Sequence, residues 1–364
     1  MCPAWLSLDG LRIIKDEAEH KNSFGQLLPA PRGPHGSTCP GQLVAPGGPC
    51  FSEVPLGQRK GTLMPGLLVS MAVADAYGGG FEFADPVFVA ANNDLQSYRP
   101  HPKGTIKPGC YTDDTQMALG LAGLLLNGDP LTTRNLARHF LAAYKRDPRY
   151  GYSQVFQQIL NQAKNADGLI NRLQPHSDKS GGAMRAAPLG LLPDPRQVVD
   201  LAMWQASLTH ATRDGMTAAA AAALLVYYCR QGSDPGDLPG LLTTHLPEVT
   251  WVSSYLPNQP VSSRGLDVVR AALWALIDDG PFSLAAILQR SVAYTGDVDT
   301  VAAIACAAAS MHPGIAQDLP QCLLDGLENG PYGRDYLAVV DQQLLNKYPL
   351  QETPFMLDPL DLSR

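Results

Sequence analysis

Apolar residues recur every three to four positions through most of the chain after Gly61, and this period predicts α-helices. Alternating patterns typical of strands are scarce. The expected helices, in chain order, are Leu63–Ala76, Gln116–Leu126, Leu136–Tyr144, Val155–Ala163, Val198–Ser207, Met216–Arg230, Leu266–Asp278, Leu284–Ala293, Thr300–Met311 and Tyr336–Leu345. Pro, Gly, Asp and Asn fill the segments between them, as turns require. The fold class that follows is all-α, with one compact multi-helix domain and no internal repeat.

The first 60 residues differ from the rest of the chain. They contain eight prolines and eight glycines, a composition typical of segments that do not fold alone. We therefore expect an N-terminal extension at 1–60, a main domain at 61–350 and a C-terminal tail at 351–364. The extension is either a passive tail or a partner-binding segment, and Cys39 and Cys50 within it could form a disulfide.

Composition limits the classes of partner. The net charge of -7 offers no basic surface to a nucleic-acid backbone. No apolar run reaches the ~18 residues that a membrane span needs. The seven cysteines follow no CxxC or zinc-binding pattern. We expect a cytoplasmic protein with reduced thiols and with neither a membrane nor a nucleic acid as its partner.

Two adjacent carboxylates precede one of the expected helices. Asp113 and Asp114 lie between Thr112 and Thr115. At a helix N-terminus, Thr112 or Asp113 can cap free N–H groups, and the acids gain from the helix dipole. A cap needs only one such residue, so four polar residues in succession leave a second role open.

A second segment repeats this chemistry far along the chain. Asp297 and Asp299 follow Gly296 and precede Thr300, again at the start of an apolar helix. If the two helix starts converge, four carboxylates repel one another unless cations neutralise them. Two divalent ions balance this charge, and oxygen ligands favour Mg²⁺ or Mn²⁺ over zinc. The sequence therefore predicts a two-metal centre.

Other segments are candidates for contact with a substrate. Glu82 follows a glycine run and lies between two phenylalanines, so it is either a general acid or base or a surface residue after a helix end. The glycine-containing turn at 177–185 is either a phosphate cradle or an ordinary loop. His210, at a helix end, is either structural or a contact to the substrate. Asp147, in a loop after a helix, is a candidate for contact with the acceptor.

Taken in this order, the segments resemble the ADP-ribosylglycohydrolase family from about residue 65 to residue 309. The family's Y-T-D-D-T segment is matched at 111–115 and its G-D-x-D-T segment at 296–300. Its opening G-D-A-x-G helix with a downstream glutamate is matched by Asp75, Gly78 and Glu82.

Two more family segments are matched, one of them less well. The S-x-T-H helix end corresponds to 207–210, and the G-N-G-A-x-M-R loop corresponds to 180–185 with changes. The positions that depart from the family pattern are Ala74, Lys179, Ser180, Thr295 and Val298. None of these departures removes a metal-ligating side chain.

The resemblance implies an all-α fold that binds two divalent metal ions, Mg²⁺ or Mn²⁺. It assigns the metal ligands to Thr112, Asp113, Asp114, Asp297, Asp299 and Thr300. It places Glu82 beside the reacting ribose, so that Glu82, Asp113 and Asp299 are the catalytic candidates. It assigns substrate contacts to the backbone N–H groups of Gly181, Gly182, Ala183 and Met184 and to the side chain of His210.

The function expected from this resemblance is hydrolysis that removes ADP-ribose from a modified acceptor, with ADP-ribosyl-arginine on a protein as the first candidate. Some family members resemble immunity proteins, which suggests an ADP-ribosyltransferase toxin as a further partner of residues 1–60. The alternative is a non-catalytic binding protein that blocks a transferase through this extension. A two-metal phosphohydrolase is a third class, disfavoured because no histidine lies in either acidic segment.

Overall fold

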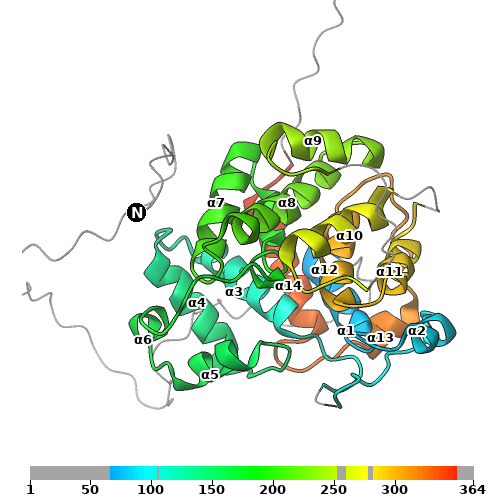
Figure 1. Cartoon of the computed structure of the whole chain (residues 1–364), viewed down its shortest axis with the longest axis horizontal. Coiled ribbons are helices and arrows are strands. Elements are labelled where there is room, and N and C mark those ends of the chain that lie inside the picture. Colours follow the sequence, from blue (N-terminus) through cyan, green and yellow to red (C-terminus); the bar gives the residue numbers. More distant parts are fainter. Residues whose placement is uncertain (1–65, 105, 252–259, 278–281, 351–364) are drawn as a thin grey trace, which may run out of the picture.

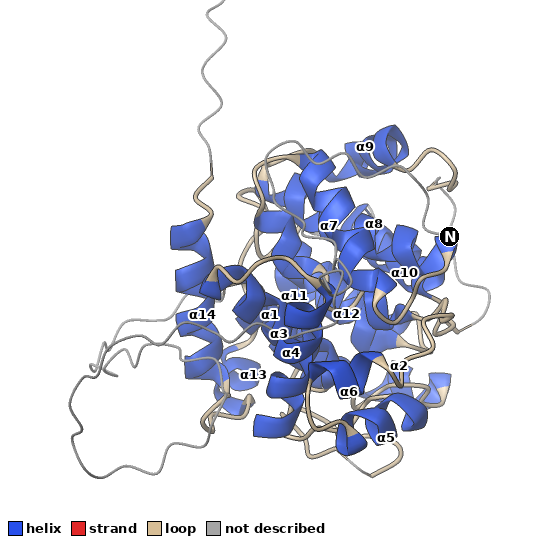
Figure 2. Cartoon of the chain, turned by 90° about the vertical axis from the view of Figure 1, so that its left-hand side faces the viewer, coloured by secondary structure: helices blue, strands red, loops and turns tan. Residues whose placement is uncertain are grey.

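The computed structural model describes residues 66–104, 106–251, 260–277 and 282–350. Within these ranges all regular structure is helical, apart from isolated single-residue bridges (Figure 2). The α-helices are α1 (Leu67–Gly78), α2 (Pro86–Asn92), α3 (Asp113–Asn127), α4 (Thr133–Arg146), α5 (Gln154–Gln162), α6 (Ala166–Ile170), α7 (Pro195–Ser207), α8 (Arg213–Arg230), α9 (Leu238–His245), α10 (Gly265–Ile277), α11 (Leu284–Ala293), α12 (Val298–Ala309), α13 (Gln321–Gly326) and α14 (Arg334–Lys347). Short 3₁₀ turns are η1 (Ser180–Gly182), η2 (Ala187–Leu191) and η3 (Pro235–Asp237).

The all-α prediction is confirmed, and each of the ten expected helices corresponds to a helix of the structure. The helices that the hydropathy pattern did not predict are the short α2, α6, α9 and α13. The segments 1–60 and 351–364, together with Cys39 and Cys50, lie outside the described residues. No described helix is long and apolar enough to cross a membrane.

Helices α1 and α12 form the centre of the molecule and pack along each other (Figure 1). Every residue of both helices is buried, as expected for helices that are apolar on all sides. Helices α3, α8, α10, α11 and α14 surround this pair. Because α1 and α12 have no solvent-facing side, polar side chains at their ends are enclosed as well.

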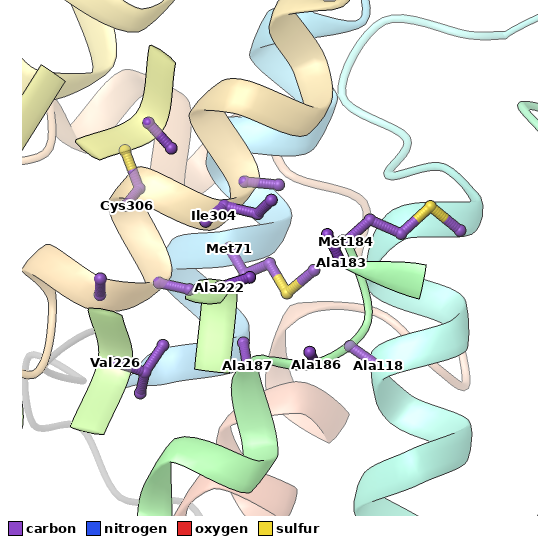
Figure 3. Close-up of a cluster of buried hydrophobic side chains, with 14 of the residues drawn as sticks. Met71, Ala118, Ala183, Met184, Ala186, Ala187, Ala222, Val226, Ile304 and Cys306 are labelled. Atoms are coloured by element: carbon purple, nitrogen blue, oxygen red, sulfur yellow. The ribbon is translucent and has the colours of Figure 1, made fainter. Parts of the chain in front are cut away.

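Small side chains set the close spacing of these helices. Helix α12 contains alanine at most positions after Val301, and α8 contains a run of six alanines at 218–223. Interaxial distance depends on the side chains at the contact, so alanine allows helices to approach closely. Figure 3 shows Met71 of α1 and Ile304 of α12 in one buried cluster with Ala222 of α8. This packing fixes where the helix ends lie.

Candidate active site

The starts of α3 and α12 and the segment that follows α1 meet at one cavity. Its volume is about 610 Å³. The acidic side chains that line it are Glu82, Asp113, Asp114, Asp297 and Asp299, and Thr300 lines it too. Basic side chains from Arg172, Lys179 and Arg185 line other parts of the same cavity. The two acidic segments, far apart in the sequence, are therefore neighbours in space.

A buried carboxylate on α1 holds the start of α3. Asp75 is fully buried and accepts hydrogen bonds from the backbone N–H and the hydroxyl of Thr112 and from the same two groups of Thr115. The two hydroxyl contacts are short, at 2.7 and 2.6 Å. Thr112 is also the N-cap of α3, and its hydroxyl oxygen faces the N–H of Asp114. Asp75 thus fixes the direction in which Asp113 and Asp114 leave the helix.

Glycine allows the second acidic segment to approach α1. A Cβ atom on Gly78 would lie 2.5 Å from the Cα of Asp299, so no larger residue fits between α1 and the start of α12. Asp297 accepts hydrogen bonds from the hydroxyls of Ser180 and Thr300, both at 3.1 Å. The Ser180 contact ties the glycine-containing turn to this acidic segment.

The backbone before α12 is unusual. Thr295 has a φ of 58° and Gly296 a φ of 91°, both in the left-handed region. The N–H of Val261 donates to the carbonyl of Thr295, and the N–H of Asp297 donates to the carbonyl of Val261. This double contact turns the chain so that Asp297 and Asp299 face the cavity.

The acids of the cavity are poorly stabilised as isolated charges. Burial raises the pKa of Asp113, Asp114 and Asp299 well above the usual range, and neighbouring carboxylates raise each pKa further. Burial raises the pKa of Asp297 to about 6. One carboxylate oxygen of Asp114 and one of Asp299 are buried without a hydrogen-bond partner among the described residues. Such groups are stable when cations neutralise them.

The donor set fits divalent cations. Glu82, Asp297 and Asp299 each offer an oxygen, and these oxygens lie within 4.8 Å of one another. All of these ligand atoms are oxygens, which Mg²⁺ and Mn²⁺ prefer. The buried oxygens of Asp114 and Asp299 that accept no hydrogen bond are available to such a cation. Thr112 is buried next to Asp114, with its hydroxyl 3.5 Å from a carboxylate oxygen of that residue. The six ligand assignments remain a prediction: five of these residues line the cavity, whereas Thr112 does not, and its hydroxyl donates to Asp75.

The glycine-containing turn uses some of its own backbone N–H groups in internal hydrogen bonds. Residues 180–182 form the 3₁₀ turn η1, and the N–H groups of Ala183 and Met184 both donate to the carbonyl of Ser180. These two amides are therefore not free to hold a diphosphate, which corrects the expected set. Gly181 and Gly182 remain candidates.

The histidine at the end of α7 lies against this turn. A Cβ on Gly181 would lie 2.9 Å from the His210 ring, so only glycine fits there. His210 lines the cavity, and burial lowers its pKa to about 3, so the ring is neutral. Its Nδ1 lies 2.7 Å from the hydroxyl of Thr209.

Arg185 lies next to this histidine and has no acidic partner among the described residues. Its guanidinium donates to Gln205 and to the hydroxyl of Thr209 and stacks over the ring of Phe140. Burial lowers the pKa of Arg185 to about 9. It adds a positive charge to a cavity that is otherwise rich in acids.

Asp147 is not among the residues that line the cavity. Its carboxylate accepts two hydrogen bonds from Arg149, whose guanidinium also pairs with Glu328 and stacks on the ring of Tyr111. The expected contact between Asp147 and an acceptor therefore has no support in the geometry. Arg149 holds the loop after α4 against the residue that precedes Thr112.

The sequence motifs did not single out Arg172 and Tyr152, which line the cavity, or His101, which contacts Glu82. The Nε2 of His101 lies 2.6 Å from the Oε2 of Glu82, and His101 is buried in the loop between α2 and α3. No helix period or acidic motif marks this residue. The available signal is the tetrapeptide His101–Gly104, H-P-K-G, which is typical of a tight turn.

Comparisons with known proteins find similarities over much of the chain. The family model described as ADP-ribosylglycohydrolase matches residues 64–354. Human ADP-ribosylhydrolase ARH3 is 33% identical over 188 residues, which cover 47% of this chain and 51% of that protein. The chain therefore spans about half the length of this relative. The mouse ARH3 is also 33% identical, over 183 residues that cover 46% of this chain and 49% of that protein.

Two further similarities extend over more of the chain. The ADP-ribosylarginine hydrolase Tri1 of Pseudomonas putida (strain GB-1) is 25% identical over 288 residues, covering 72% of this chain and 75% of that protein. A solved structure named ADP-ribosylglycohydrolase-related protein complex superposes with a TM-score of 0.57 at 21% identity. It covers 78% of this chain and 96% of the other, and it shows that the fold is shared.

Proposed function

The chain belongs to the ADP-ribosylglycohydrolase family, and from this premise we propose that it is a metal-dependent hydrolase that removes ADP-ribose from a modified acceptor. The observation that carries the proposal is the convergence of five carboxylates from α1–α2, α3 and α12 on one cavity. Burial raises the pKa of most of these acids, which shows that their charged forms are poorly stabilised by the protein alone. Such perturbed acids cluster at functional sites, where bound cations and substrate stabilise the charged forms. A protein that only binds a transferase has no need of such a cluster.

We propose ADP-ribosyl-arginine on a protein as the acceptor class. The similarity to an ADP-ribosylarginine hydrolase supports this choice. The cavity volume of about 610 Å³ suits a nucleotide-sized ligand. Arg172 and Lys179 give the lining positive charge that suits a diphosphate, and the acids suit a cationic guanidinium leaving group. An immunity role against an ADP-ribosyltransferase toxin stays a prediction that depends on residues 1–60.

Asp113, Asp114, Asp297, Asp299 and Thr300, with Thr112 beside them, would hold divalent cations, which would supply polarisation of the sugar hydroxyls and positive charge to offset the carboxylate cluster. Glu82 would accept a proton from the water that attacks the ribose, because its carboxylate faces the same cavity as these acids. The carboxylates around it would stabilise the positive charge that develops on the sugar ring as the N-glycosidic bond breaks. The electron pair of that bond would leave with the nitrogen of the guanidinium, which departs as neutral guanidine and takes up the proton that Glu82 removed from water. Asp75 and Ser180 would keep these acids in place.

The test is release of free ADP-ribose from arginine-linked and serine-linked substrates, with and without a chelator. We expect release from the arginine-linked substrate, its loss with the chelator, and its loss in D299A with the helical content retained. D200N is a matched control, because Asp200 is a partly buried acid on α7 that does not line the cavity. Full activity in D299A, or activity that survives the chelator, would overturn the metal mechanism.

A further inference from the structure

A tight turn between α2 and α3 presents one buried side chain to the site. Residues 100 and 102–104 are exposed, whereas His101 is only 6% exposed. The N–H of Gly104 donates to the carbonyl of His101 at 2.7 Å, and Gly104 has a φ of 67°. Proline at the second position of such a turn fixes its backbone in advance. The turn therefore holds the imidazole in one place.

The backbone before the turn is also fixed. A Cβ on Gly80 would lie 2.7 Å from the carbonyl oxygen of Arg99, so the loop passes directly against the end of α1. The guanidinium of Arg99 bonds to Asp94 within the same loop. Glycine at position 80 thus lets the loop come close enough for His101 to reach Glu82.

The hydrogen bonds on the imidazole define its tautomer. The N–H of Lys103 donates to Nδ1 of His101 at 3.0 Å, so Nδ1 is an acceptor and holds no proton. The proton therefore lies on Nε2, which donates to Oε2 of Glu82 at 2.6 Å. A neutral ring of this kind orients a carboxylate without adding a charge to the cavity.

This contact leaves the second carboxylate oxygen of Glu82 for the cavity. Within the described residues, Oε1 of Glu82 accepts no hydrogen bond, while the carboxylate as a whole lies within reach of Asp297 and Asp299. The backbone beside it is strained, because Phe83 has a left-handed φ of 51°. A hydrogen bond from the N–H of Phe83 to the carbonyl of Gly296 holds it in this conformation. Glu82 is thus held from two sides, by the His101 ring and by the chain next to it.

We propose that His101 is a positioning residue that holds Glu82 against the start of α12 through its Nε2–H tautomer. The inference rests on the proposed function, since it concerns the same site. Glu82 belongs, with Asp297 and Asp299, to the group of oxygens that can hold a cation. A residue that orients a metal-binding carboxylate changes metal affinity or activity by about 10- to 100-fold when it is removed. We expect a loss in that range when the Nε2–H donor is removed, and a recovery when another donor replaces it.

The experiment compares H101L, which removes the donor, with H101Q, which keeps an N–H donor at similar reach. H139L is the matched control, because His139 is also buried and pairs with a carboxylate at 2.8 Å, but that carboxylate, Asp129, does not line the cavity, whereas Glu82 does. Mn²⁺ binding is measured by calorimetry, and kcat and KM are measured for ADP-ribose release. We expect H101L to bind Mn²⁺ about 10-fold more weakly and to lose kcat with little change in KM.

The expected pattern is recovery of Mn²⁺ affinity in H101Q and wild-type affinity in H139L. Mn²⁺ affinity in H101L within twofold of wild type would overturn the proposal, whatever the stability of the variant. If the wild-type chain releases no ADP-ribose from any acceptor, the proposed function fails while the calorimetry still decides the role of His101.

A spectroscopic measurement keeps the proposal testable if H101L does not fold. The imidazole nitrogens of wild-type protein are observed by ¹H–¹⁵N correlation, and the signals that disappear in H101Q identify His101. An unprotonated Nδ1 and a protonated Nε2 are the expected result. A protonated Nδ1 would exclude the bond from Lys103 and with it the proposed orientation of Glu82.

Discussion

Replacing Asp75 with asparagine changes one atom of the carboxylate that clamps the start of α3. The carboxylate accepts from four donors, the N–H and hydroxyl of Thr112 and the N–H and hydroxyl of Thr115. An asparagine side chain has only one acceptor oxygen. If that oxygen accepts from Thr115, the NH₂ group faces the hydroxyl of Thr112, which is itself a donor to the carboxylate in wild type. The Thr112 hydroxyl then has to accept from the amide, so its hydrogen turns toward the carboxylate of Asp114, 3.5 Å away, and competes with a cation for that carboxylate.

The magnitude follows from the charge on the acceptor. A hydrogen bond to a charged group contributes about 1.5–3 kcal/mol and a neutral one about 0.5–1.5 kcal/mol. Four bonds weakened by about 1 kcal/mol each give about 4 kcal/mol. Relief of the repulsion that Asp75 exerts on Asp113 and Asp114 offsets part of this loss. A net cost of about 2 kcal/mol at the site corresponds to roughly 30-fold weaker cation binding.

Calorimetric titration of D75N with Mn²⁺ measures this loss directly. D341N is the matched control, because Asp341 is equally buried and also accepts backbone N–H groups of a helix start, those of Leu68 and Val69 on α1. We expect D341N to lose stability but to keep its Mn²⁺ affinity. Mn²⁺ binding by D75N within threefold of wild type would refute the clamp.

Two further predictions concern stability. Thr295 adopts a left-handed φ that costs a non-glycine residue about 1–2 kcal/mol, so T295G is expected to raise the free energy of unfolding in urea by about 1 kcal/mol. G296A is expected to lower it by about 3 kcal/mol, because its Cβ would meet the backbone of Val261; a change of the same sign in both variants would contradict this reading. Burial raises the pKa of Asp341 from 3.8 to about 7, so the folded state binds this proton more tightly and stability falls as pH rises between those values, by about 4 kcal/mol. Urea unfolding of wild type and D341N from pH 4 to pH 8 checks this. The fall in the free energy of unfolding over this range should be about 4 kcal/mol smaller in D341N than in wild type. Equal falls in the two proteins would exclude the prediction.

The sequence was sufficient for the ten longer helices and for the chemistry at the starts of α3 and α12. The 3.6-residue period depends only on neighbours along the chain, so each of the ten expected helices was found. The short α2 and α13 were missed because so few residues cannot establish a period. Thr112 could be expected as an N-cap for the same local reason, since capping involves only the next two or three residues.

The loop chemistry was only partly predictable. A glycine pair suggests free backbone N–H groups, but whether they stay free depends on the turn that forms. In η1 the carbonyl of Ser180 takes the N–H groups of Ala183 and Met184. Asp147 looked available in the sequence, yet Arg149 occupies its carboxylate. A local pattern identifies a polar group but not the partner that satisfies it.

By itself, the sequence determined that this chain forms an all-α domain with two acidic helix starts of matching chemistry. The tertiary structure alone decided which side chains hold the site residues in place. Asp75 accepts a hydrogen bond from Thr112, Ser180 donates one to Asp297, and His101 contacts Glu82. Each of these contacts spans 19 to 117 residues of chain. A polar side chain finds such a partner only where helix packing brings the two within about 3 Å, and that distance is set by the packed core rather than by neighbours in sequence.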